Sequence, residues 1–254
     1  MNAPSLTAQQ IEQFRQQGFL ILSGAGSDLL TRFRYLAEQE HRQPTEPWEL
    51  EAKLGYPGAP ESTEQPGGDT VRRLLQATSR QSEWQQWATS KAVGQWLRSV
   101  MNTDAVHLNP NHHNCLMTKS PQYSSDTGWH QDIRYWHFQK PELVSVWFAL
   151  GEESNHNGGL VVIPGSHQAE FSEHQFDDQR FFLEVDANRE WLDRAQVLHL
   201  NAGDILLFDA RLLHRASRNH TDQTKLSLVF TYRAADNAPL PETRSARLPE
   251  LAVQ

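Results

Sequence analysis

The 254-residue sequence predicts a mainly β protein with flanking helices. From about residue 104 onward, short apolar runs rich in Val, Leu and Phe alternate with turns that contain Gly, Asn or Pro. This pattern is typical of a β-sandwich or barrel. Before residue 101, apolar residues recur mostly at helical spacing. All-β domains of this length are often single, so we expect one domain over 1–254, with a helical N-terminal part at about 5–101 and a β core at about 104–233.

The N-terminal part begins with a short predicted helix. Thr7 is a suitable N-cap, and Gln10 stands three residues on, where a capping box needs its partner. Gly18 is a suitable stop, and residues 19–22 form an apolar run that predicts a buried strand. A second helix should start near Asp28, and residues 71–101 are predicted to be mainly helical.

Residues 42–69 form an irregular segment in which repeated Pro and Gly break any regular element. Loops of this length are uncommon in compact domains unless they are functional or disordered. The segment is therefore either a lid over an active site or a solvated insertion. Nearby, Arg72, Arg73 and Arg80 either lie on a solvated helix face or contact an anionic substrate.

The β core is predicted from five apolar stretches and the turns between them. Residues 143–150 form one strand, and Asn157-Gly158-Gly159 is a turn that leads into a strand at 160–163. Residues 197–200 and 205–208 flank a predicted tight hairpin turn at 201–204, and residues 226–232 form a further strand.

Charge and composition exclude several classes of partner. The formal net charge of −8 argues against nucleic acid, because phosphate binding needs clustered Lys and Arg. No apolar run approaches the roughly 18 residues of a membrane span, and the N-terminus lacks the pattern of a secretory signal. Cys115 is the single cysteine, so no internal disulfide forms and a cytoplasmic location is expected. A small-molecule substrate is expected, and no obligate protein partner is evident.

One His-x-Asp pair and one distant His form a possible metal site. If His130 and Asp132 lie on a strand, they project from the same face, and His214 can reach them from a neighbouring strand after residues 205–208. Two imidazoles and one carboxylate suit Fe(II) and leave positions open for O2 and a co-substrate. A catalytic zinc on the same ligands is the nearest competitor, whereas structural zinc usually has four ligands including Cys. His-x-Asp is common by chance, so a surface pair is the alternative.

Three longer motifs resemble the phytanoyl-CoA dioxygenase family. They are Gly128-Trp129-His130-Gln131-Asp132, the run from Asn157 to His167, and Gly203 to Asp209 leading to His214. The resemblance covers about residues 5–233. It implies a double-stranded β-helix fold (a cupin-like jelly roll), with Fe(II), 2-oxoglutarate and O2 as cofactor and co-substrates. It also implies hydroxylation of a small molecule, with succinate and CO2 as co-products, and makes His130, Asp132 and His214 the iron ligands.

The same resemblance implies where 2-oxoglutarate binds. The family has a basic residue, normally Arg, that grips the far carboxylate, and this sequence has Lys225 there with Ser227 two residues on. Arg218 and Arg233 are alternatives to Lys225, and Trp147 matches a pocket aromatic. Because Asp132 is present where related halogenases have a small residue, hydroxylation is favoured over halogenation.

Other residues around the predicted iron are less specific. Tyr135, Trp136 and His137 could line the pocket beside it, whereas four other histidines are expected to be structural or on the surface: His107, His112, His113 and His167. A non-catalytic jelly-roll protein that binds a metabolite or metal remains an alternative function. The substrate, the role of residues 42–69 and the oligomeric state are left open.

Overall fold

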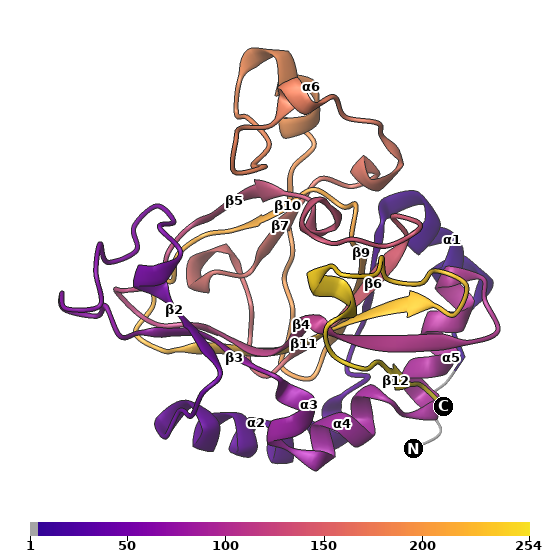
Figure 1. Cartoon of the computed structure of the whole chain (residues 1–254), viewed down its shortest axis with the longest axis horizontal. Coiled ribbons are helices and arrows are strands. Elements are labelled where there is room, and N and C mark those ends of the chain that lie inside the picture. The colour runs from indigo at the N-terminus through magenta and orange to yellow at the C-terminus, as the bar shows by residue number, and fades with distance from the viewer. Residues whose placement is uncertain (1–4) are drawn as a thin grey trace.

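The computed structural model describes residues 5–254, and two antiparallel β-sheets facing each other form its centre (Figure 1). The larger sheet has the strand order β1-β9-β6-β11-β4-β3-β2, with β12 paired to β4, and the smaller has the order β5-β10-β7-β8. The large sheet consists of β1 (Phe19–Leu22), β2 (Trp48–Leu50), β3 (Val71–Leu75), β4 (Val106–Lys119), β6 (Leu143–Ala149), β9 (Ile205–Asp209), β11 (Lys225–Ala234) and β12 (Leu251–Ala252). The small sheet consists of β5 (Thr127–His130), β7 (Leu160–Val162), β8 (Gln196–Val197) and β10 (His214–Ala216).

Helices cover the face of the large sheet that points away from the small sheet. Figure 1 shows α2, α3 and α4 beneath this sheet, while the segment that carries α6 extends beyond the small sheet on the opposite side. The helices are α1 (Ala8–Gln17), α2 (Ser27–Arg42), α3 (Ala77–Arg80), α4 (Ser82–Ala88), α5 (Lys91–Met101) and α6 (Arg189–Leu192). Among the described residues, no helix is both long and apolar enough to cross a membrane.

Alternation along the strands builds two cores. On β11, Leu228 and Phe230 belong to the cluster between the large sheet and the helices. The intervening Val229 belongs to a second cluster, between the two sheets, together with Trp147 and Phe208. Because successive strand residues point to opposite faces, Lys225 and Ser227 lie on the same side of β11 as Val229. The sequence of this one strand therefore directs both polar side chains into the space between the sheets.

Local signals predicted the N-terminal elements well. Thr7 and Gln10 form the expected capping box, and Gly18 ends α1 with a left-handed φ of 80°. A side chain at Gly18 would place its Cβ 2.5 Å from the ring of His167, so both the backbone conformation and the space require glycine.

In the β core, residues 143–149 and 225–234 form the expected strands β6 and β11.

Several expectations about secondary structure are wrong. Residues 48–50, within the segment expected to be irregular, form β2, because they pair with β3. Residues 71–75 form β3 rather than the start of a helix, because they pair with both β2 and β4. The hairpin at 201–204 does not exist, because Val197 pairs with β7 in the small sheet whereas β9 pairs with β1 and β6 in the large sheet. The turn at 201–204 thus carries the chain from one sheet to the other, a choice of partners that local sequence does not encode.

Candidate metal centre and adjoining pocket

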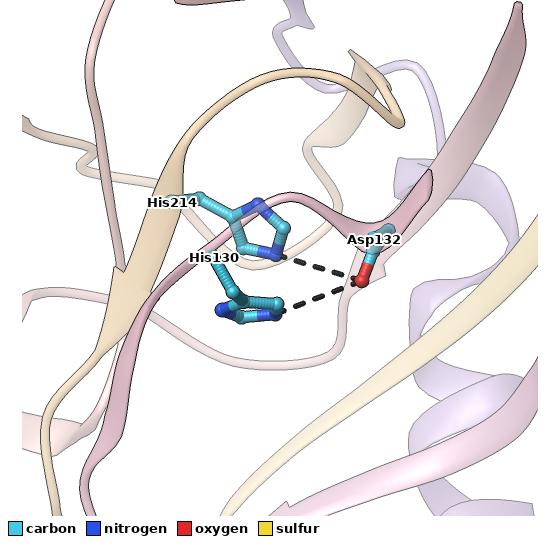
Figure 2. A group of neighbouring side chains, drawn as sticks. All are labelled: His130, Asp132 and His214. Carbon is cyan, nitrogen blue, oxygen red and sulfur yellow. Dashed lines mark ion pairs between the residues drawn. The ribbon is translucent and has the colours of Figure 1, made fainter. Parts of the chain in front are cut away.

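The three predicted ligands converge between the sheets. His130 ends β5 and His214 begins β10, and these two residues are directly paired across the strands. The candidate ligand atoms of His130, Asp132 and His214 all lie within 4.8 Å of one another. Figure 2 shows both imidazoles directed at the carboxylate of Asp132. Its Oδ1 lies 3.6 Å from His130 Nε2 and 4.0 Å from His214 Nε2.

The route by which Asp132 reaches the histidines differs from the prediction. The strand ends at His130, and Asp132 begins a 3-10 turn, Asp132–Tyr135. The expectation that His130 and Asp132 share one strand face is therefore wrong, although both side chains still reach the same point. This turn, and not a continued strand, brings the carboxylate of Asp132 toward His214.

Backbone carbonyls orient both imidazoles. His130 Nδ1 lies 2.8 Å from the carbonyl oxygen of Gly128, and His214 Nδ1 lies 2.9 Å from that of Leu212. A carbonyl oxygen can only accept a hydrogen bond, so each Nδ1 must be the donor. In the neutral form of each imidazole, Nε2 then keeps its lone pair for a metal. Asp132 Oδ2 is buried and has no hydrogen-bond partner among the described residues. A buried oxygen without a partner is costly, and a metal ion would supply the missing interaction.

The charges of these groups also suit a metal ion. Burial lowers the pKa of His214 to about 4, with the nearby His130 acting in the same direction. Burial alone would raise the pKa of Asp132, but the surrounding imidazoles of His113, His214 and His130 outweigh it and hold that pKa well below its usual value. At neutral pH the site therefore presents a neutral His214 and an ionised carboxylate, the protonation states that metal binding requires.

A pocket extends from the two histidines into the space between the sheets. Aromatic and aliphatic side chains form its walls, and four cationic side chains also line it. The residues around it include His113, Met117, His130, Trp147, Leu160, Phe208, His214, Arg72, Arg73, Lys119 and Lys225. The same cavity thus borders on the candidate metal ligands and on positive charges that suit an anionic co-substrate.

A family model described as phytanoyl-CoA dioxygenase (PhyH) matches residues 14–227. The chain belongs to this family. The human peroxisomal phytanoyl-CoA dioxygenase is 23% identical over 242 residues, which cover 91% of this chain and 69% of that protein. The ectoine dioxygenase of Stutzerimonas stutzeri (strain A1501) is 22% identical over 260 residues, which cover 93% of this chain and 80% of that protein.

Another relative matches over a shorter stretch. A probable alpha-ketoglutarate-dependent hypophosphite dioxygenase of Stutzerimonas stutzeri is 27% identical over 133 residues, 50% of this chain and 46% of that protein. This chain thus matches less than half the length of that relative. The three named substrates differ widely in chemistry.

Solved structures confirm the jelly-roll fold. EctD from S. alaskensis, crystallised with 2-oxoglutarate and 5-hydroxyectoine, superposes with a TM-score of 0.76 at 20% identity and covers all of this chain and 89% of that chain. The carbocyclase SnoK of nogalamycin biosynthesis gives a TM-score of 0.72 at 18% identity, with 100% of each chain covered. Family membership also confirms the predicted enzyme class, a non-haem dioxygenase dependent on Fe(II), 2-oxoglutarate and O2.

Within this dioxygenase pocket, Lys225, Ser227 and Trp147 form one buried cluster around Glu153. The Lys225 ammonium lies 3.1 Å from Glu153 Oε2 and donates to the Ser227 hydroxyl at 3.0 Å. Ser227 in turn donates to Glu153 Oε1 at 2.6 Å, and the Trp147 indole N–H donates to the same oxygen at 2.9 Å. Sequence reasoning did not single out Glu153, although its carboxylate organises all three predicted residues.

The two arginines considered as alternatives lie elsewhere. Arg218 pairs with Asp126 at 2.9 Å, is about one third exposed and does not line the pocket. Arg233 is paired with Glu250 near the opposite end of β11. Of the three candidate cations, Lys225 is therefore the one placed beside the pocket.

His113 and two arginines contribute more to the pocket than the sequence indicated. His113, expected to be structural or on the surface, lines the pocket with Nε2 3.7 Å from Asp132 Oδ1. It lies within an irregularity in the pairing of β4 with β11, where Phe230 pairs with Asn114 but Thr231 pairs with Asn109. Pro110 was the only local signal of that irregularity. Arg72 and Arg73 also line the pocket from β3, so a solvated helix face is excluded for them.

The remaining candidates lie around this centre. Tyr135 is partly exposed and packs edge-on against His130, while Trp136 stacks on His112 and contacts His113 edge-on. Arg80 instead ties α3 to Glu40 of α2 and to the carbonyls of Thr45 and Pro47 in the irregular segment. His137 is exposed.

Proposed function

We propose that this dioxygenase hydroxylates a small molecule at an iron held by His130, Asp132 and His214. The observation that supports this assignment best is the convergence of two Nε2 atoms on a buried carboxylate whose second oxygen has no hydrogen-bond partner within residues 5–254. With 2-oxoglutarate and O2, bound Fe(II) supplies the oxidising chemistry, and the protein supplies geometry and exclusion of water. Asp132 completes the facial triad, which favours hydroxylation over halogenation.

Within this proposal, 2-oxoglutarate occupies the pocket between the metal cluster and the lysines. Trp147, Leu160 and Phe208 provide apolar walls that exclude water from the metal. Lys225 faces the far carboxylate as a point charge, in place of the fork that an arginine would offer. Ser227 supports Lys225 instead of donating to the ligand, because its only proton is donated to Glu153.

We also propose that part of the irregular segment is a lid. The Tyr56 ring packs edge-on against Phe181 with centroids 5.5 Å apart, and Phe181 packs edge-on against His130. The Tyr56 ring also contacts Arg72, whose guanidinium lies 4.8 Å from the centre of the ring. Tyr56 therefore links the segment to a metal-binding histidine and to a cation of the pocket, as a cover over the substrate would.

The proposed setting is the cytoplasm. Cys115 is buried and free, which fits a reducing compartment. The proposed partner is a small-molecule substrate, with no nucleic acid, membrane or obligate protein partner.

The decisive experiment replaces His130, Asp132 and His214 singly with Ala and measures Fe(II) binding and succinate formation from 2-oxoglutarate. Each variant should lose iron and reduce succinate formation at least 100-fold. His137→Ala is the matched control, because His137 is exposed and close in sequence to the ligands. Full activity in any ligand variant would refute the assignment. Iron binding by the wild-type protein without succinate, across a panel of substrates, would favour the non-catalytic alternative.

A further inference from the structure

A second cavity lies outside the pocket of the proposed reaction, between β4 and the C-terminal segment, residues 235–254. The pairing of β12 with β4 holds this segment against the large sheet (Figure 1). The cavity has a volume of about 310 Å³ and shares no lining residue with the pocket. Its walls come from the end of β3, the irregular part of β4 and residues 244–248. Of the residues that line it, Arg244 and Arg247 are cationic and none is acidic.

The two arginines come from a part of the chain that the family model does not match. The match ends at residue 227, before the C-terminal segment begins. A 3-10 turn at Arg244–Ala246 precedes Arg247, and residues three apart lie on the same side of such a turn. The turn therefore presents both side chains to one cavity, and the chemistry shared with the family does not account for them.

Neither arginine has a carboxylate partner within the described chain. Most arginines of this protein form an ion pair within 4.0 Å, as Arg72, Arg73 and Arg80 do, whereas Arg244 and Arg247 form none among residues 5–254. The Nε of Arg244 donates to the backbone carbonyl of Asn111 at 3.2 Å, which fixes the side chain against β4. The cavity thus borders on two positive charges that no described residue neutralises.

His112 adds a buried imidazole to the wall of the cavity. Its Nε2 lies 2.7 Å from the hydroxyl of Ser245, which also accepts from the backbone N–H of His137 at 2.9 Å. The hydroxyl's own proton then has His112 Nε2 as its acceptor, so the neutral ring carries its proton on Nδ1. Burial lowers the pKa of His112 to about 3, and the charge of Arg244 acts in the same direction, so the ring is neutral at pH 7.

The Nδ1 of His112 lacks an acceptor. Only 7% of this residue is exposed, and Nδ1 has no hydrogen-bond partner among the described residues. Buried polar groups in folded proteins are nearly always paired, so an unpaired one indicates a missing partner. Two guanidinium groups and an imidazole N–H around one cavity are all donors, which is the complement of a carboxylate or a phosphate.

A series of ring contacts connects the cavity with the metal centre. His112 stacks on Trp136 with the ring centroids 4.8 Å apart, and Trp136 contacts His113 edge-on at 5.3 Å. His113 Nε2 in turn lies 3.7 Å from Asp132 Oδ1. A ligand in the cavity is therefore separated from the metal-binding carboxylate by these three rings.

We propose that this cavity binds a small molecule through an oxyanion, a carboxylate or a phosphate, held by Arg244 and Arg247 with His112 as a third donor. Its volume lies at the lower end of the range for small-molecule sites. The anion belongs either to the substrate, whose other end reaches past the rings to the metal, or to a separate effector. The site itself goes beyond the proposed function, and only its use by the substrate rests on that function.

The binding test titrates inorganic phosphate by calorimetry at pH 7. The full chain is loaded with Fe(II) and 2-oxoglutarate without O2, so that the pocket is occupied and no turnover takes place. The wild-type protein should bind one phosphate saturably. Arg244→Met and Arg247→Met should each weaken this binding roughly tenfold, since each removes a charge-assisted hydrogen bond.

Two further variants make the test specific to this cavity. His112→Phe removes the third donor but keeps a ring to stack on Trp136, and it should weaken phosphate binding roughly three- to tenfold. Arg180→Met is the matched control, because Arg180 is also exposed and also has no ion pair within the described chain. Its affinity for phosphate should equal that of the wild type.

A second measurement distinguishes the two sources of the anion. Iron-loaded protein with 2-oxoglutarate and O2 is given a panel of carboxylates and phosphate monoesters, each beside its uncharged methyl ester or parent alcohol. Increased succinate formation with the anionic members alone, lost in Arg244→Met but kept in Arg180→Met, assigns the anion to the substrate. A change in succinate formation caused by phosphate itself, with the same dependence on Arg244, assigns it to an effector.

Equal phosphate affinity of the wild type, Arg244→Met and Arg247→Met would overturn the inference, as would the absence of saturable binding by the wild type. Either result leaves the proposed function standing. Failure of the wild-type protein to bind Fe(II) and 2-oxoglutarate would overturn the proposed function instead, and the same titration of the full chain alone would still test the site.

Discussion

Glu153 and Lys225 form an ion pair that is almost completely removed from water, with side chains 1% and 2% exposed. The carboxylate accepts three hydrogen bonds, from Lys225, Ser227 and Trp147. In this way β11, which supplies the lysine proposed to bind the co-substrate, is tied to the loop after β6. Removing one partner of such a pair leaves a buried charge without compensation.

Glu153→Gln should therefore destabilise the protein by roughly 3–5 kcal/mol, because the Lys225 ammonium would face an amide in place of a carboxylate. The free energy of unfolding in urea measures this change. Glu152→Gln is the matched control, since the neighbouring side chain is exposed and its substitution should change stability by less than about 0.5 kcal/mol. Similar small effects of both substitutions would contradict the role assigned to the pair.

The metal-free protein should lose stability as the pH falls from about 6.5 toward 4. Burial lowers the pKa of His113 and His214 to about 4 and that of His112 to about 3, so in this range the unfolded chain binds protons that the folded chain does not. The stability is fully present above the unfolded pKa of about 6.5, and each such histidine removes up to about 1.4 kcal/mol per pH unit below it.

Urea unfolding at a series of pH values measures this slope. His112→Phe should reduce it, because one buried imidazole is removed, whereas His199→Ala should not, because His199 is exposed. A flat profile between pH 6.5 and 4.5 would show that these imidazoles are not buried in neutral form. Asp132, whose pKa is held below its usual value, contributes only at still lower pH.

Tyr56→Ala tests the lid. If Tyr56 closes the site through Phe181 and Arg72, its removal should reduce substrate-dependent 2-oxoglutarate turnover roughly tenfold and leave Fe(II) binding unchanged. Tyr35→Ala, which removes an exposed ring on α2, should change neither quantity. Unchanged turnover in Tyr56→Ala would identify residues 42–69 as an insertion without a part in the reaction.

The sequence by itself identified the three candidate metal ligands and most of the elements that carry them. His130, Asp132 and His214 were identifiable because motifs around each ligand are local in the chain, and a capping box such as Thr7 with Gln10 requires only neighbours. Apolar alternation likewise predicted β6 and β11, because periodicity is a property of a single strand.

Only the tertiary structure decided which strands are partners and which charges neutralise each other. The pairing of β3 with β4 turned an expected helix start into a strand and moved Arg72 and Arg73 into the pocket. The contact between Glu153 and Lys225, 72 residues apart, and the ladder that sets Lys119 against Lys225 arise from non-local hydrogen bonding. Such pairings depend on the whole sheet, so no local pattern in the chain specifies them.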